Sequence, residues 1–376
     1  MEFKRRDVLT FDSGRQVTVE DVKEGGMGLV YICQPGRYST TTAFKTFKKQ
    51  YFDENKAVLN SFLKECNTWI SLGTHPFICA ADRVESINGQ PFVEMRSYKN
   101  NLGYEIINNK LPKRVKAVMR LALEICLAMV HAGKKIEGFV HRDLKPNNIL
   151  LGLTGSPVVN ATWQDEEELF KGEFFPPWGH AVVTDFGLSK VISELQNDIP
   201  SRCVSVKGLK TFLFSKAGKI CGTPPYMSPE QCVGRKLDKR SDIYSFGCVL
   251  FEMLTGYLVF PARSGDEFIY HHIHSKPPDI KRINPRVPLD FANIITKCLE
   301  KKPRHRFTDF MEIYSDIRNT LPIWDKLDKF YNYALRGIFR SSPTRKADDQ
   351  RLESEAFELL YKAYKFYQLK DDKKAH

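Results

Sequence analysis

The chain has 376 residues, of which 42% are hydrophobic, 27% charged and 12% aromatic, and this composition excludes a disordered chain, a collagen and a small disulfide-stapled scaffold. Its 57 Lys and Arg residues outnumber 45 Asp and Glu residues and leave a net charge of +12, which suits phosphate-bearing ligands, an acidic partner or simply a solvated basic surface. The apolar stretches are too short to cross a bilayer and the charged N-terminus lacks a signal-peptide core, so we expect no membrane span.

Strands are predicted first along the chain. Residues 15–47 contain alternating and short apolar runs, interrupted by a glycine turn at 25–28. Residues 54–72 then carry apolar residues at helical spacing. From residue 111 onward helices dominate, and the most apolar of them are expected at 112–133, 239–256 and 289–300. A strand-rich part followed by a helical part indicates an α+β fold.

Three segments depart from this pattern. Residues 153–180 combine glycines and prolines with an acidic cluster and the aromatic residues Phe174, Phe175 and Trp178, so we expect an insert that is either a solvated loop or a docking arm. Residues 189–220 are irregular. Residues 321–376 contain two helical stretches, which either pack on the helical part or mediate a homodimer or the docking of a partner.

The most informative sequence is His-Arg-Asp-Leu-Lys-Pro-Asn-Asn at 141–148. It places a carboxylate (Asp143), an amine (Lys145) and a carboxamide (Asn148) in one loop. Phosphoryl transfer needs such a set, because a carboxylate orients and deprotonates the hydroxyl, a cation balances the moving charge and an oxygen binds magnesium. A second carboxylate, Asp185, follows an apolar run and precedes Phe-Gly, which suits another metal ligand.

With these motifs the sequence resembles the eukaryotic-type (Hanks-type) serine/threonine protein kinase family, and its motifs look most like those of the bacterial branch. The resemblance covers residues 15–320. It implies a bilobal fold made of an N-terminal extension (1–14), a small β-rich N-lobe (15–95), a hinge (94–101), a larger helical C-lobe (102–320) that includes the insert 153–180 and an activation segment (185–230), and a helical tail (321–376).

The family motifs imply a site for ATP with Mg²⁺ or Mn²⁺. Lys45, in Thr-Ala-Phe-Lys, matches the lysine that contacts the α- and β-phosphates, and Glu65 matches its ion-pair partner. Asp143 would orient the substrate hydroxyl and accept its proton, while Lys145 would neutralise phosphate charge. The metal ligands would be Asn148 and Asp185, and the other nucleotide contacts would be Val22, Gly25, Gly26, Gly28, Val30, Ala43, Glu94 and Met95.

Other motifs of the family follow in order. Gly-Thr-Pro-Pro-Tyr-Met-Ser-Pro-Glu resembles the end of the activation segment, and its Glu230 would pair with Arg306. Asp242 would hold the backbone of the catalytic loop. Lys145 together with Thr223 is the pattern of serine/threonine rather than tyrosine kinases. Candidate phosphorylation sites in the activation segment are Ser205, Thr211 and Ser215.

Two departures concern the glycine turn at 25–28, which resembles the second half of the glycine-rich loop of the family. Lys23 stands where the first glycine is expected, and Met27 replaces the usual aromatic residue at the tip, so we expect weaker use of ATP rather than none.

The resemblance implies transfer of the γ-phosphoryl group of ATP to Ser or Thr of a protein substrate, with autophosphorylation of the activation segment. The alternatives are a nucleotide-binding pseudokinase scaffold that acts through its tail and a small-molecule kinase of the same core fold.

The nine cysteines are spread along the chain without a C-x-x-C pair. Zinc clusters and disulfide frameworks need closely spaced cysteines, so this pattern predicts free thiols and a cytoplasmic protein. No nucleic-acid partner is expected.

Overall fold

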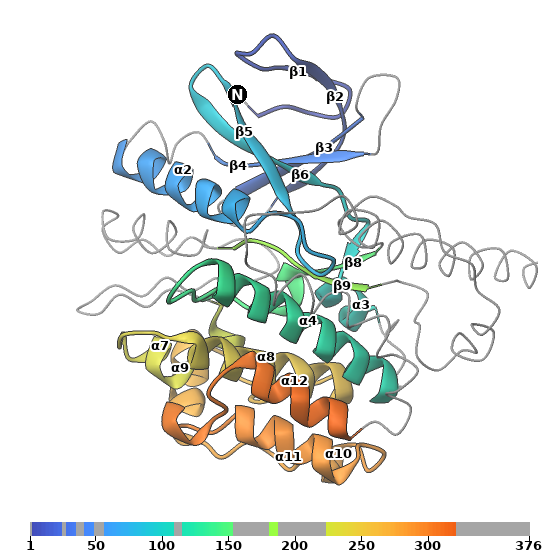
Figure 1. Cartoon of the computed structure of the whole chain (residues 1–376), viewed down its shortest axis with the longest axis vertical. Coiled ribbons are helices and arrows are strands. Elements are labelled where there is room, and N and C mark those ends of the chain that lie inside the picture. Colours follow the sequence, from blue (N-terminus) through green and yellow to red (C-terminus); the bar gives the residue numbers. More distant parts are fainter. Residues whose placement is uncertain are drawn as a thin grey trace, which may run out of the picture.

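The N-terminal part of the protein is a six-stranded sheet. The computed structural model describes residues 2–24, 28–34, 41–48, 56–108, 115–152, 180–186 and 223–320. The strand order is β1-β2-β3-β4-β6-β5, and all neighbours are antiparallel. The strands are β1 (Val8–Thr10), β2 (Gln16–Glu24), β3 (Gly28–Gln34), β4 (Thr42–Phe47), β5 (Ala81–Ile87) and β6 (Gln90–Arg96). One helix, α2 (Lys56–Ser71), lies beside this sheet (Figure 1).

The rest of the described chain is mainly helical and lies on the other side of α2 (Figure 1). A small sheet with the order β7-β8-β9 sits where the two parts meet. The elements are β7 (Asn100–Asn101), α3 (Leu102–Ile107), α4 (Val115–Lys135), η1 (Pro146–Asn148), β8 (Ile149–Gly152), β9 (His180–Val183), η2 (Pro224–Tyr226), α7 (Pro229–Cys232), α8 (Lys239–Thr255), α9 (Gly265–His274), α10 (Ile280–Ile283), α11 (Leu289–Cys298), η3 (Pro303–His305) and α12 (Phe310–Asn319). The predicted α+β, two-part architecture is confirmed, and the four predicted helices correspond to α2, α4, α8 and α11.

Several expectations concern residues outside the described ranges. They are those for Gly25, Gly26 and Met27, for residues 153–179 of the insert, for 187–222 of the activation segment with Ser205, Thr211 and Ser215, and for the tail 321–376. The last residue of the predicted insert, His180, begins β9.

The two faces of the large sheet pack against different groups of residues. The outer face carries a separate cluster, here called the outer cluster, formed by Leu9, Phe11, Val17, Val19, Leu29, Tyr31, Cys33, Phe44 and Phe92. The inner face adds Ala43, Phe47, Val93 and Met95 to the main core, which continues into the helical part. Because β1 lies within the predicted extension 1–14 and supplies Leu9 to the outer cluster, the sheet begins earlier than predicted.

A β-bulge in β2 decides which of its side chains reach the inner face. Val19 pairs with Cys33, whereas Asp21 pairs with Ile32, so one extra residue of β2 is accommodated at Glu20. Side chains alternate between the faces of a strand, and an inserted residue reverses the alternation beyond it. Val22 therefore packs against the outer cluster.

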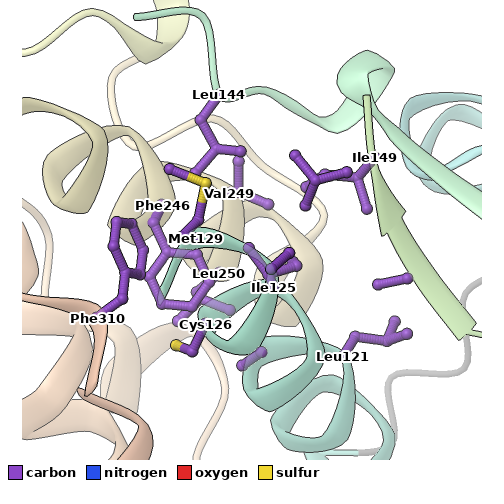
Figure 2. Packing of buried hydrophobic residues seen from close by; sticks show 14 of the residues in the cluster. Leu121, Ile125, Cys126, Met129, Leu144, Ile149, Phe246, Val249, Leu250 and Phe310 are labelled. Atoms are coloured by element: carbon purple, nitrogen blue, oxygen red, sulfur yellow. The ribbon is translucent and has the colours of Figure 1, made fainter. Parts of the chain in front are cut away.

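The main core holds the loop 141–148 in place. α8 begins at Asp238, whose side chain accepts a hydrogen bond from the backbone of the first turn, and it ends at Gly256 in the left-handed conformation. Figure 2 shows side chains of α8 and α4 packing together, with Leu144 joining them from within the loop 141–148 and Ile149 from directly after it. All of these side chains belong to one buried cluster, so the loop is anchored at its middle and at its C-terminal end.

Gly247→Ala tests how tightly α8 is packed. A Cβ atom at Gly247 would lie 2.8 Å from Cβ of Cys298 and 3.1 Å from side-chain atoms of Leu299. We expect this variant to lose about 1–3 kcal/mol of unfolding free energy, measured by urea denaturation, because overpacking forces neighbours to move. Gly133→Ala in α4 is the matched control, since its Cβ would meet nothing within 4 Å. Equal stability of the two variants would contradict the packing described for α8.

The described cysteines fit the expectation of free thiols. Seven of them, in the part of the chain that the structure describes, are free and buried. Within the same residues, the helices are too short or too polar for any of them to span a bilayer.

Candidate active site

The catalytic loop is held by a buried aspartate of α8. The two carboxylate oxygens of Asp242 accept hydrogen bonds from the backbone N–H groups of His141, at 2.7 Å, and Arg142, at 2.8 Å. Burial raises the pKa of Asp242 to about 6, although these hydrogen bonds oppose the rise. Arg142 has a φ of 70°, in the left-handed region that non-glycine residues rarely adopt. The predicted role of Asp242 is confirmed, and it stabilises a strained backbone directly before Asp143.

Asp143 lies at the centre of a compact hydrogen-bond network. Its Oδ2 accepts from Nζ of Lys145 at 2.6 Å and from Nδ2 of Asn148 at 3.1 Å. Its Oδ1 accepts from Oγ1 of Thr223 at 3.0 Å, and the ammonium of Lys145 also contacts this hydroxyl at 2.7 Å. Two residues predicted as catalytic and one predicted metal ligand thus contact one another, and Thr223 adds a hydroxyl from the end of the activation segment.

Asp185 lies beside this network at the end of β9. The backbone N–H of Thr184 donates to the carbonyl of Asn148 at 3.0 Å, which places the two predicted metal-binding segments next to each other. Asp185 has a φ of 66°, a second left-handed residue of the site. Its carboxylate accepts from Nζ of Lys45 at 2.5 Å. Burial alone would raise the pKa of Asp185, but Lys45, and more weakly Lys145, hold this pKa below its usual value.

These oxygens form a donor set that suits Mg²⁺ or Mn²⁺. The ionised carboxylate of Asp185 is a hard ligand, and the Asn148 side chain uses its nitrogen on Asp143, so its carboxamide oxygen is the atom suited to a cation. A divalent ion would also balance the negative charges that the site gathers around it. The residues present therefore fit the predicted metal.

Lys45 comes from β4 and points to the inner face. It pairs across the strands with Val30 on one side and Val93 on the other. Its ammonium contacts Asp185, whereas the predicted ion pair between Lys45 and Glu65 stays a prediction. Glu65 is buried in α2, the helix that packs beside this face.

The phenylalanine that follows Asp185 connects α2 to the catalytic loop. Phe186 is fully buried. Its ring centroid lies 6.5 Å from that of Trp69 in α2 and 5.2 Å from the ring of His141. Movement of α2 would therefore displace Asp185 and the catalytic loop 141–148, because close-packed aromatic rings transmit displacement.

The structure brings only some of the predicted nucleotide contacts to the inner face. Val30, Ala43 and Met95 lie there, and Ala43 pairs directly with Met95. A side chain at Gly28 would have its Cβ 3.1 Å from the carbonyl oxygen of Thr46, which explains a glycine at this close approach.

Two predicted contacts point the other way. Val22 packs against the outer cluster because of the bulge in β2. Glu94 alternates with Val93 and Met95, and its carboxylate forms a bidentate contact with Arg15 on the outer side, at 2.5 and 2.7 Å. The side chain of Val22 is thus not brought to the site, and Glu94 could offer only its backbone.

The end of the activation segment is tied to the helical part by a buried ion pair. Arg306 donates to both carboxylate oxygens of Glu230, at 2.7 and 2.9 Å, which confirms the predicted pair. Burial opposes ionisation, but Arg306 holds the pKa of Glu230 below its usual value. Gln231 adds a hydrogen bond of 2.7 Å from its side chain to the carbonyl of Arg142. Through Gln231, the segment that follows Thr223 therefore contacts the catalytic loop directly.

Sequence reasoning missed a buried charge cluster behind β9. Glu124 accepts hydrogen bonds from Arg120 at 3.0 Å, from Nδ1 of His180 at 2.7 Å and from the backbone N–H of Ala181 at 2.8 Å. All three side chains are buried. The signal was present as two opposite charges four residues apart in the apolar middle of α4, but the partner of Glu124 at the start of β9 is 56 residues away.

Comparison with known proteins agrees with this geometry. The family model "Protein kinase domain" matches residues 17–317, so the chain belongs to the protein kinase family. It is similar to the serine/threonine-protein kinase PrkC of Bacillus subtilis, with 28% identity over 306 residues that cover 81% of this chain and 40% of that protein. It is similar to the serine/threonine-protein kinase pkn3 of Myxococcus xanthus, with 28% identity over 287 residues, 76% of this chain and 46% of that protein.

The fold is shared with solved kinase domains. The crystal structure of the Mycobacterium tuberculosis PknI kinase domain matches with a TM-score of 0.53 and 18% identity, and the match covers 83% of this chain and 98% of that one. The chain spans less than half the length of the curated relatives PrkC and pkn3.

Proposed function

We propose that the protein transfers the γ-phosphoryl group of ATP to serine or threonine hydroxyls of proteins. The observation that carries the proposal is the contact of Asp143 with Lys145, Asn148 and Thr223 directly beside the Lys45–Asp185 pair. Family membership and the printed names of PrkC and pkn3 as serine/threonine-protein kinases support it.

Each side chain has a distinct task in this proposal. Asp143 accepts a hydrogen bond from the substrate hydroxyl, orients its oxygen toward the γ-phosphorus and takes its proton as the new P–O bond forms and the bond from the γ-phosphorus to the oxygen that stays with ADP breaks. Lys145 lies 2.6 Å from that carboxylate and balances charge on the transferred group. Lys45 does the same for the phosphates that remain with ADP. A bound Mg²⁺ or Mn²⁺, held by Asn148 and Asp185, would supply further neutralisation of the phosphate oxygens.

Thr223 supports a hydroxyl-bearing aliphatic substrate. Its Oγ1 bridges Asp143 and Lys145, and Lys145 together with Thr223 is the pattern of serine/threonine rather than tyrosine kinases. We also propose autophosphorylation within residues 187–222, docking of partners or a second copy through the tail, and a cytoplasmic location. The free, buried thiols favour a reducing compartment.

An assay with radiolabelled ATP tests the proposed activity. The full chain is incubated with Mg²⁺ or Mn²⁺ and a degenerate Ser/Thr peptide library, and we expect label in the peptides and in the chain itself. Asp185→Ala should abolish both, because Lys45 loses its partner and the metal loses a charged ligand. The exposed Asp290 provides the control variant Asp290→Ala, which should retain activity.

The outcomes separate the alternatives. Nucleotide binding without any transfer by the wild type would favour a pseudokinase scaffold. Transfer to small hydroxyl compounds, but not to peptides, would favour a small-molecule kinase. Either result would contradict the proposed function.

A further inference from the structure

Lys23 occupies a position on the inner face of the sheet beside the catalytic lysine. The bulge in β2 turns Lys23 inward and Val22 outward. Lys23 pairs with Val30, and Val30 pairs with Lys45, so these three residues form one row across neighbouring strands. Directly opposite residues of adjacent strands share a face, and two strand spacings separate the backbones of the two lysines by roughly 10 Å.

The side chain of Lys23 reaches from the sheet to the segment that leaves it. Its Nζ donates to the carbonyl oxygen of Lys99 at 3.2 Å. Lys99 lies between β6 and β7, where the chain passes from the sheet into the helical part. This hydrogen bond therefore joins residues that are 76 apart in the chain, one in β2 and one in the segment between β6 and β7. It is a single exposed hydrogen bond.

The row of Lys23, Val30 and Lys45 indicates where the Lys23–Lys99 hydrogen bond would lie relative to a bound nucleotide. In the proposed function, Lys45 contacts the phosphates and the backbone near Met95 contacts the base. A nucleotide that spans these two groups lies under the row that Lys23 shares with Lys45. The stem of Lys23 and its bond to Lys99 then cross the path by which the nucleotide enters and leaves.

We propose that Lys23 is a residue of the nucleotide site that controls nucleotide exchange, by closing the path between β2 and the 97–99 segment. The proposal rests on the proposed function, because it requires a nucleotide on the inner face. The bond between Lys23 and Lys99 joins two groups of the chain itself, so in this proposal it closes over the empty and the filled site alike. Breaking it is required for both entry and exit, and its loss speeds both without changing the affinity.

The test compares two lysine variants of the full chain. Lys23→Met keeps the length of the side chain and removes the donor. Lys99→Met is the matched control, since it also removes one ammonium group but keeps the backbone carbonyl that accepts the bond. Association and dissociation of ATP and ADP with Mg²⁺ are measured by rapid filtration of radiolabelled nucleotide, and the dissociation constants are measured by calorimetry. Thermal unfolding of both variants is measured alongside.

For Lys23→Met we expect both rate constants to rise about threefold to tenfold, the range for breaking one ordinary hydrogen bond. The dissociation constant should stay within about twofold, and Lys99→Met should behave as the wild type. Unchanged rates in Lys23→Met would overturn the inference, as would a weaker affinity with an unchanged association rate, because that indicates direct contact with the nucleotide. Absence of nucleotide binding by the wild type would instead refute the proposed function.

Discussion

Asp143→Ala is expected to lower the rate of phosphoryl transfer at saturating ATP by roughly 10²–10⁴-fold, the range for loss of a positioned general base. The carboxylate contacts Lys145, Asn148 and Thr223 together, so its loss removes both the proposed proton acceptor and the centre of the network. The dissociation constant of ATP should change little, because in the proposed function Asp143 binds the substrate hydroxyl rather than the nucleotide. Single-turnover kinetics and calorimetry measure the two quantities separately.

Two further variants make this result interpretable. Asp143→Asn preserves the shape of the side chain and should show a similar loss of rate, because an amide cannot take the proton. Glu137→Ala, at an exposed position after α4, is the control and should retain full activity. If Asp143→Asn kept most of the rate, the assigned role as proton acceptor would be wrong. A large rise in the ATP dissociation constant would show that the carboxylate serves nucleotide binding instead.

Glu124→Ala is expected to lower the unfolding free energy by about 3–5 kcal/mol, the cost of removing one partner from a buried ion pair. Arg120 and Glu124 have side chains that are 1% and 0% exposed, so the variant would remove a negative charge from beside a guanidinium buried in the core. Arg120 and His180 hold the pKa of Glu124 below its usual value in spite of burial, so the carboxylate is ionised at neutral pH. Urea denaturation, monitored by tryptophan fluorescence, measures the loss.

An exposed ion pair provides the control for Glu124. Arg282 lies 3.7 Å from Asp279, and its side chain is 89% exposed. Arg282→Ala should change the unfolding free energy by less than about 1 kcal/mol, because solvent screens such a pair. If Glu124→Ala cost no more than Arg282→Ala, the cluster behind β9 would not contribute to stability as its geometry indicates.

The catalytic groups could be predicted from the sequence because short motifs carry their own local geometry. Asp143 and Asn148 are five residues apart in one loop, and Asp185 follows a buried strand that pairs with the strand leaving that loop. Once β8 and β9 pair, the three side chains must meet. Lys45 was predicted from the resemblance of Thr-Ala-Phe-Lys to a family motif, and the register of β4 places it on the inner face.

Other features depended on geometry that no local pattern encodes. The bulge at Glu20 exchanges the faces of Val22 and Lys23, and a single extra residue leaves no compositional trace in an exposed strand. The cluster around Glu124 needs a contact with His180 across residues 153–179, so helical spacing could have indicated only its Arg120 half, which sequence reasoning did not use. Contacts between distant segments depend on tertiary packing. The sequence predicts such a contact only when a known motif identifies both of its partners.

The main core runs without interruption from Ala43 and Val93 of the sheet to Phe246 and Leu250 of α8. The two parts of the molecule therefore share one continuous interior, beside the separate outer cluster of the sheet. We expect the sheet and the helical part to unfold together, and a cut between them to expose apolar surface that promotes aggregation.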